Sequence, residues 1–197
     1  MIRKAMIVLS GLALVAWTAG CRVQVDKDAS GKEKKVQVDT PFGGVHVNTD
    51  RTTASDLGLP VYPGATLDKG NDDHKSADVH MGIGEWQLRV QVVSYASSDP
   101  QDKVVAFYKQ ALARYGPVIT CRNNTAVGTP TATPEGLTCS DDRKHTNVDI
   151  GNNVQLKAGS KHHQHIVGFE NSKDGQTKFA LVALDLPSGV DSSDTSD

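Results

Sequence analysis

The sequence has few aromatic residues and no excess of basic charge. Only 5% of its 197 residues are Phe, Trp or Tyr, and 21 Lys and Arg residues stand against 23 Asp and Glu residues. Proteins that bind nucleic acid usually concentrate Lys and Arg on one surface, where these residues neutralise phosphates. No such concentration is present, and we expect no nucleic-acid partner.

The motifs that identify common catalytic and cofactor sites are also missing. The chain contains no GxSxG, SxxK, HExxH or GxxxxGK[ST] motif, and no GxGxxG that follows a strand. The paired carboxylates Asp72–Asp73 and Asp141–Asp142 lie in polar, turn-like runs, where aspartates are typically solvated. The sequence therefore assigns no catalytic residue and no cofactor, although a hydrolase with dispersed catalytic residues is an alternative.

Long apolar runs are absent except at the N-terminus. There the run IVLSGLALVAW follows Arg3 and Lys4 and is followed by the small residues TAG. A helix that crosses a bilayer needs about 20 apolar residues, so a run this short is not expected to remain as an anchor. Positive residues, a short apolar core and a small-residue cleavage site are typical of a secretory signal peptide. We interpret residues 1–20 as that signal.

Cys21 directly follows the expected cleavage site. This arrangement resembles the lipobox of bacterial lipoproteins, in which the cysteine takes a lipid and becomes the new N-terminus. Two or more acyl chains would give stable anchoring, so we expect a membrane partner through lipid on Cys21. Secretion without lipid is the alternative, because Thr18 stands where lipoboxes usually carry an aliphatic residue. The next residue is Arg22 and not aspartate, which in such lipoproteins implies the periplasmic side of the outer membrane, where the cell has one.

Cysteine is scarce, with three residues in the chain. If Cys21 carries lipid, Cys121 and Cys139 remain, and disulfides persist in an exported protein. The segment between them is rich in Thr, Pro, Gly and Asn and predicts a long irregular loop. A metal site is the alternative, but two cysteines at this spacing without CxxC partners fit zinc poorly. We predict a Cys121–Cys139 disulfide.

Alternating apolar and polar residues predict strands close to the anchor. RVQVD at 22–26 and KVQVD at 35–39 are near copies, and VHVN at 45–48 resembles them. We divide the exported chain into a lipid-anchored spacer (21–34), a small β-hairpin element (35–50), an α+β domain (51–187) and a disordered tail (188–197). A wholly disordered spacer is the alternative for residues 22–34.

The main domain is expected to be an antiparallel β-sheet with one amphipathic helix packed on it. The helix signal is SSDPQDKVVAFYKQALARYG, with Ser98 or Asp99 as cap, Pro100 at the first helical position and Gly116 at the end. Its apolar residues form one stripe that needs a sheet to cover it. Strands are predicted from EWQLRVQVVSYAS and from five segments from residue 117 onward, including FALVALDL.

The densest cluster of potential metal ligands is KHHQH at 161–165. On a strand, His163 and His165 share a face and could chelate a divalent ion. Further ligands would have to come from distant residues such as His145, Asp141 or Asp142. The alternative is an exposed strand end with solvated histidines.

Three segments together resemble a family. LPVYPGA at 59–65, an alternating strand and the helix segment at 98–116 are similar to a pattern in uncharacterised bacterial envelope lipoproteins. The resemblance covers roughly residues 36–186, and its motifs are turns, a capped helix and packing aromatics. It implies an exported, lipid-anchored domain and brings no activity, ligand or catalytic residue with it.

The leading functional hypothesis is a lipid-anchored, non-catalytic protein of the bacterial cell envelope that binds another envelope component. We expect the contact surface on the open face of the sheet or on the 122–138 loop, although neither contains an exposed apolar run. The alternatives are a small-ligand or metal-binding module that uses the strand at 161–165, or the dispersed hydrolase.

Overall fold

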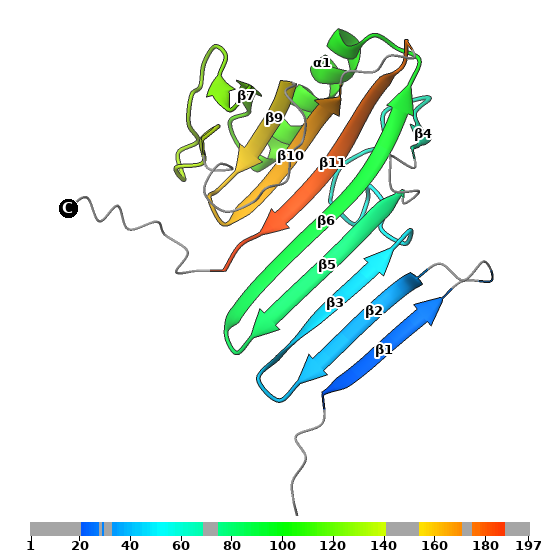
Figure 1. Ribbon diagram of the computed structural model, residues 1–197. Coiled ribbons are helices and arrows are strands. Elements are labelled where there is room, and N and C mark those ends of the chain that lie inside the picture. The colour runs from blue at the N-terminus through cyan, green and yellow to red at the C-terminus, as the bar shows by residue number, and fades with distance from the viewer. Residues whose placement is uncertain are drawn as a thin grey trace, which may run out of the picture.

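The computed structural model describes residues 21–27, 29, 33–68, 75–140, 154–170 and 175–187 (Figure 1). The strands in this part of the chain are β1 (Arg22–Lys27), β2 (Glu33–Thr40), β3 (Gly43–Thr49), β4 (Thr66–Leu67), β5 (Ser76–Ile83), β6 (Trp86–Ser97), β7 (Ile119–Arg122), β8 (Thr125–Ala126), β9 (Val154–Gly159), β10 (His163–Glu170) and β11 (Thr177–Asp185). The helices are α1 (Gln101–Leu112) and the 3₁₀ turn η1 (Ala113–Tyr115). The expected signal peptide and the C-terminal tail lie outside the described residues.

The strands form one 11-stranded sheet with the order β1-β2-β3-β5-β6-β11-β10-β9-β7-β8, and β4 pairs with β6. Every pairing is antiparallel. Helix α1 packs on one face, at the end that contains β9 and β10 (Figure 1). This arrangement confirms the expectation of an antiparallel sheet with one helix packed on it.

The first strands of the described chain belong to the same sheet as the strands that follow them. Residues expected to form a separate hairpin element are β2 and β3, and β3 pairs with β5 from Gly44↔Gly82 to Thr49↔Ala77. Strand β1 begins at Arg22, within the expected spacer, and pairs with β2. The near copies RVQVD and KVQVD lie side by side in that pair. Because the alternating patterns of β3 and β5 match residue by residue, the sheet continues across the expected boundary.

The main core lies between α1 and the sheet. The helix residues Val104, Tyr108 and Leu112 are fully buried, as their spacing of four residues predicts for one face of a helix. They pack against alternate residues of the strands beneath. The buried sheet residues of this core are Val93, Tyr95, Leu156, Ala158, Val167, Phe169, Phe179 and Leu181.

The start of α1 differs from the expectation. Pro100 is the N-cap and makes no side-chain cap hydrogen bond. The Asp99 carboxylate instead accepts a hydrogen bond from the Tyr62 hydroxyl at 2.8 Å, and Lys103 Nζ lies 3.4 Å from its other oxygen. The predicted cap residue therefore ties the helix start to a loop 37 residues earlier in the chain. The end agrees better with the prediction, since Gly116 follows η1 with a φ of 115°.

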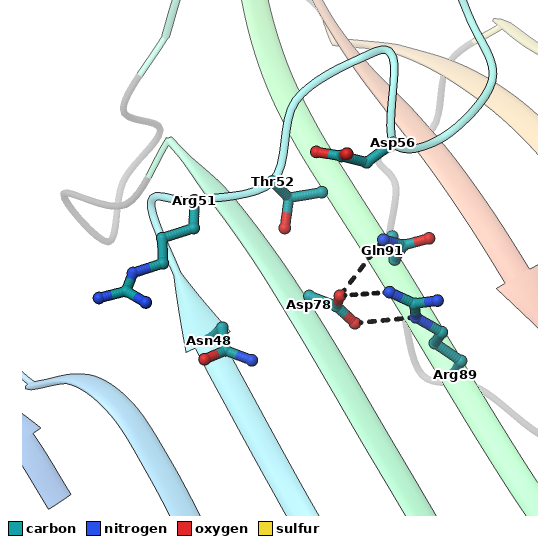
Figure 2. Close-up of a pocket in the computed structure, with 7 residues that line it drawn as sticks. All are labelled: Asn48, Arg51, Thr52, Asp56, Asp78, Arg89 and Gln91. Atoms are coloured by element: carbon teal, nitrogen blue, oxygen red, sulfur yellow. Dashed lines mark hydrogen bonds and ion pairs between the residues drawn. The ribbon is translucent and has the colours of Figure 1, made fainter.

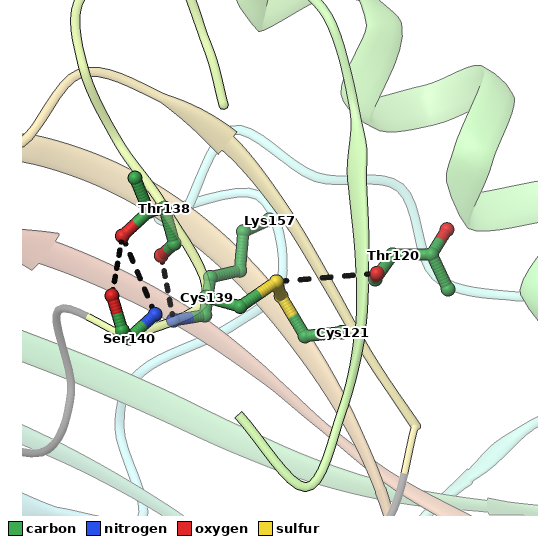
Figure 3. The surroundings of a disulfide bond; sticks show 6 residues. All are labelled: Thr120, Cys121, Thr138, Cys139, Ser140 and Lys157. Atoms are coloured by element: carbon green, nitrogen blue, oxygen red, sulfur yellow. Dashed lines mark hydrogen bonds between the residues drawn. A yellow bond between two sulfur atoms is a disulfide. The ribbon is translucent and has the colours of Figure 1, made fainter. Parts of the chain in front are cut away.

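A second, smaller core surrounds the disulfide (Figure 3). Cys121 and Cys139 are bonded, as predicted, with their Cα atoms 5.6 Å apart. Both are buried together with Ile119 and Leu137. The predicted loop between the cysteines contains the short strand β8 and a β-bridge between Ala132 and Thr138. This loop therefore has a small core of its own.

Candidate functional site: an uncovered apolar sheet face

The alternating residues of the first strands gather on one face of the sheet. Directly opposed residues in an antiparallel pair share a face. Val38 of β2 lies opposite Val23 of β1 and opposite Val45 of β3, which in turn lies opposite Met81 of β5. The apolar residues that the register aligns in this way are Val23, Val25, Val36, Val38, Val45, Val47, Val79, Met81, Leu88 and Val90.

This apolar face lies opposite the helix. Val93 and Tyr95 of β6 belong to the core beneath α1, and successive residues of a strand point to opposite sides. Val90 and Val92 therefore point away from α1. No helix of the described residues lies over β1, β2, β3 and β5, and α1 sits at the far end of the sheet (Figure 1).

Three side chains of this face are exposed, and the other seven are half-buried. Val23 retains 61% of its surface, Val25 42% and Val45 36%. Single exposed apolar residues are ordinary, whereas a contiguous apolar patch that contains several exposed residues indicates an interaction surface. We name the ten aligned residues the apolar face.

A groove lies on the apolar face at one end of the strands. Phe42 in the β2–β3 turn and Ile83 and Trp86 beside the β5–β6 turn form its rim, and they are 81%, 62% and 39% exposed. The groove has a volume of about 360 Å³ and is lined by Val38, Thr40, Phe42, Gly43, Gly44, Val45, Met81, Gly82, Ile83 and Trp86. Strand β1 begins at the same end, because Arg22 lies opposite Asp39. The groove and Cys21 are therefore at one end of the sheet.

The opposite side of the same strands is polar and contains a second cavity of about 470 Å³ (Figure 2). Arg89 of β6 donates two hydrogen bonds to Asp78 of β5, from Nη2 at 2.7 Å and from Nε at 3.2 Å. Gln91 donates to the same carboxylate at 3.3 Å. The hydrogen bonds that Arg89 donates to the Asp78 carboxylate raise the pKa of Arg89 above its ordinary value. The remaining lining residues are Asn48, Arg51, Thr52 and Asp56.

Most charged side chains of this polar cavity hydrogen-bond to neighbouring residues. Besides the Arg89–Asp78 pair, the Asp56 carboxylate accepts bonds from the Thr53 hydroxyl at 2.7 Å and from the Thr53 backbone N–H at 2.8 Å. These bonds lower the pKa of Asp56. The seven lining residues include no Ser, Cys or His; the hydroxyl among them belongs to Thr52 and the carboxylates to Asp56 and Asp78. The cavity offers hydrogen-bonding groups.

The two candidate metal ligands point to different partners. His163 Nδ1 lies 2.9 Å from an Asp185 carboxylate oxygen at an exposed strand end. His165 stacks on Tyr115, with ring centroids 3.6 Å apart, and burial lowers its pKa. Asp185, a charge at the end of an apolar strand, is thus explained by exposure and by its contact with His163.

Within the described residues, no group of three or more His, Cys, Asp or Glu side chains could hold a metal ion. The more distant ligand candidates His145, Asp141 and Asp142 lie outside that part of the chain. Metal binding by His163 and His165 stays a prediction.

Cys21 is an exposed free thiol immediately before β1. An exposed cysteine at the start of a strand leaves room for a modified side chain. None of the helices that the structure describes is both long enough and apolar enough to span a bilayer.

Sequence reasoning missed the apolar face and one buried lysine. Lys157 is fully buried beside the disulfide, and its Nζ donates to the Thr138 carbonyl at 3.5 Å (Figure 3). The signal for the apolar face was present, because β1, β2 and β3 share the same alternating pattern, but its meaning depends on the register between them.

Comparisons with known proteins leave the chain without an assigned relative: no family model, no curated protein and no solved structure matches it.

Proposed function

We propose that this protein is a lipid-anchored, non-catalytic component of the bacterial cell envelope, and that its apolar face binds another envelope protein. The observation that carries the proposal is the apolar face of β1, β2, β3 and β5, over which no helix of the described part of the chain lies. Burial of apolar surface is worth about 25 cal/mol per Å². Val23, Val25 and Val45 are exposed, so a partner that covers them would stabilise the complex by burying their apolar surface.

The location follows from the N-terminus. The signal-like residues before Cys21 support export, and acyl chains on Cys21 would hold the mature chain at a membrane. Because Arg22 follows the cysteine, we place the protein on the periplasmic side of the outer membrane in a cell that has one. The Cys121–Cys139 disulfide is compatible with that oxidising compartment.

Cys21 and helix α1 lie at opposite ends of the strand order. Its first strand follows the anchor directly, whereas helix α1 and the disulfide core lie at the other end of the strand order. The apolar face is thus near the membrane, where a membrane-bound or lipoprotein partner is concentrated.

Photo-crosslinking in intact cells tests the proposal. Val45 and His46 are adjacent residues of β3 whose side chains point to opposite faces, so a photoreactive residue at each position forms a matched pair. We expect a discrete protein adduct from position 45 and none of the same mass from position 46. Equal adducts from both positions, or adducts from neither, would overturn the proposed binding face.

A further inference from the structure

Strand β1 is an open edge of the sheet. All six of its residues are exposed, and it ends the strand order with β2 as its neighbour among the described residues. Open edges usually carry proline, a bulge or an inward-pointing charge that prevents pairing with another chain. The segment 22–26 contains no proline, and the register irregularity comes after it, between Asp26 and Lys27.

The pairing of β1 with β2 shows that this motif is self-complementary. RVQVD and KVQVD differ only in the choice of basic residue, and they pair antiparallel. Charges of opposite sign lie opposite each other at both ends, valines lie opposite valines, and glutamine lies opposite glutamine. The pairs are Arg22↔Asp39, Val23↔Val38, Gln24↔Gln37, Val25↔Val36 and Asp26↔Lys35.

We propose that the outer edge of β1 pairs antiparallel with β1 of a second copy of this chain, in a register centred on Gln24. Arg22 then faces Asp26 of the second copy, Val23 faces Val25, and Gln24 faces Gln24. This register repeats, on the free edge, the contacts that β2 already makes on the other edge. Opposite charges and apolar pairs directly across an antiparallel ladder are stabilising.

The resulting dimer is closed and symmetric. Its twofold axis is perpendicular to the sheet at Gln24, so the same edge is used by both copies and no further β1 edge is left open. A perpendicular axis keeps the apolar faces of both copies on the same side. The proposal does not depend on the proposed partner or on lipidation, because it uses the strand edge and not the apolar face.

Charge substitution at the axis provides a sharp test. Gln24 is exposed on β1, and its neighbour Gln37 is already bonded to Asp39 at 2.7 Å, so folding does not depend on the Gln24 side chain. Gln24→Lys or Gln24→Glu places two like charges opposite each other in the dimer, which opposes pairing. One copy of each variant instead forms a Lys–Glu pair.

The experiment co-expresses two epitope-tagged copies of the full chain and measures their co-purification in detergent. We expect the unmodified copies to co-purify. Two Gln24→Lys copies, or two Gln24→Glu copies, should co-purify at least tenfold less. One Gln24→Lys copy and one Gln24→Glu copy should restore co-purification. Unchanged co-purification of like-charged copies overturns the proposal, as does a loss that the mixed pair fails to recover. Circular dichroism of each variant shows whether the fold is retained.

Cysteine crosslinking fixes the register in cell membranes. Gln24→Cys places two thiols at the axis and is expected to give a disulfide-linked dimer on a non-reducing gel. Gln37→Cys, one strand inward, is the matched control and is expected to give none. The unmodified chain keeps Cys21, but the two Cys21 residues would lie about 20 Å apart along the paired strands at ~3.4 Å per residue. A dimer linked through Cys21, or the same yield from Gln24→Cys and Gln37→Cys, contradicts the register.

Discussion

The Tyr108 hydroxyl accepts a hydrogen bond from the backbone N–H of Tyr62 at 3.2 Å. The same hydroxyl donates to the Pro60 carbonyl at 3.1 Å, and the Tyr108 side chain is fully buried. Tyr62 also lies edge-on to Phe107, with ring centroids 5.2 Å apart. Helix α1 and the segment 59–65 are therefore linked by hydrogen bonds and by ring packing.

Replacement of Tyr108 should lower the free energy of unfolding. Tyr108→Phe removes both hydrogen bonds and leaves the Tyr62 N–H and the Pro60 carbonyl without that partner. We expect the free energy of unfolding to fall by about 1–3 kcal/mol, the cost of leaving a buried polar group unpaired. Urea unfolding of the purified protein in detergent measures it. Tyr62→Phe is the matched control, since it removes only the bond to the partly exposed Asp99; an equal loss from both variants would contradict the account.

Close backbone approach at Gly43, the first residue of β3, gives a second prediction. A Cβ on Gly43 would collide with the Gly82 carbonyl and contact Ile83, whereas a Cβ on Gly82 would meet its nearest neighbours at 3.8 Å. Gly43→Ala should therefore lower the free energy of unfolding by about 1–3 kcal/mol, as overpacking does. Gly82→Ala should change it less. Thermal unfolding of the two variants checks this, and a reversed order would count against the β3–β5 register.

The disulfide should stabilise the fold by restricting the unfolded chain. Its cysteines are 18 residues apart, and the chain-entropy model gives about 3 kcal/mol for a loop of this size. The double variant Cys121→Ala, Cys139→Ala should lose about that amount of unfolding free energy. Reductant should destabilise the parent protein by a similar amount and leave the double variant unchanged. A double variant that still responds to reductant would contradict this assignment.

The stacked histidine makes stability depend on pH. Burial lowers the pKa of His165 below its ordinary value of 6.5 in the folded protein. Below about pH 6.5 the unfolded chain therefore binds a proton that the folded protein does not, so the free energy of unfolding falls as the pH falls from 7 to 5. Above about pH 7 the histidine contribution is constant.

His165→Phe retains an aromatic ring against Tyr115 and removes the titrating group. We expect a smaller slope of the unfolding free energy between pH 5 and 7, because the variant has no imidazole that takes up a proton on unfolding. Urea unfolding at pH 5, 6 and 7 measures the slope. His163→Phe is the comparison variant, and an unchanged slope in His165→Phe would show that another group causes the effect.

Local patterns predicted the helix and most strands. The spacing of Val104, Tyr108 and Leu112 is set by the helix itself, so it can be read from neighbouring residues. The position of Asp99 could not be predicted, since its partner Tyr62 is 37 residues away. The capping role of Asp99 was inferred from neighbouring residues alone. In the structure its carboxylate contacts the distant Tyr62 instead.

The apolar face shows the same limit. Val23 and Val25 are separated by a polar residue, as are Val45 and Val47, so no strand contains a continuous apolar run. The exposed surface arises only when the strands align these valines side by side, and that register is a property of the folded sheet. The disulfide could be predicted because two cysteines remained once Cys21 was set apart for lipid.

Anchoring through Cys21 is the central claim, and metabolic labelling with palmitate combined with membrane fractionation tests it most directly. We predict that labelled palmitate enters the parent protein, which sediments with membranes, and that Cys21→Ser is unlabelled and appears in the soluble fraction. A Cys21→Ser protein that still sediments with membranes, together with a parent protein that never takes up the label, would contradict the claim.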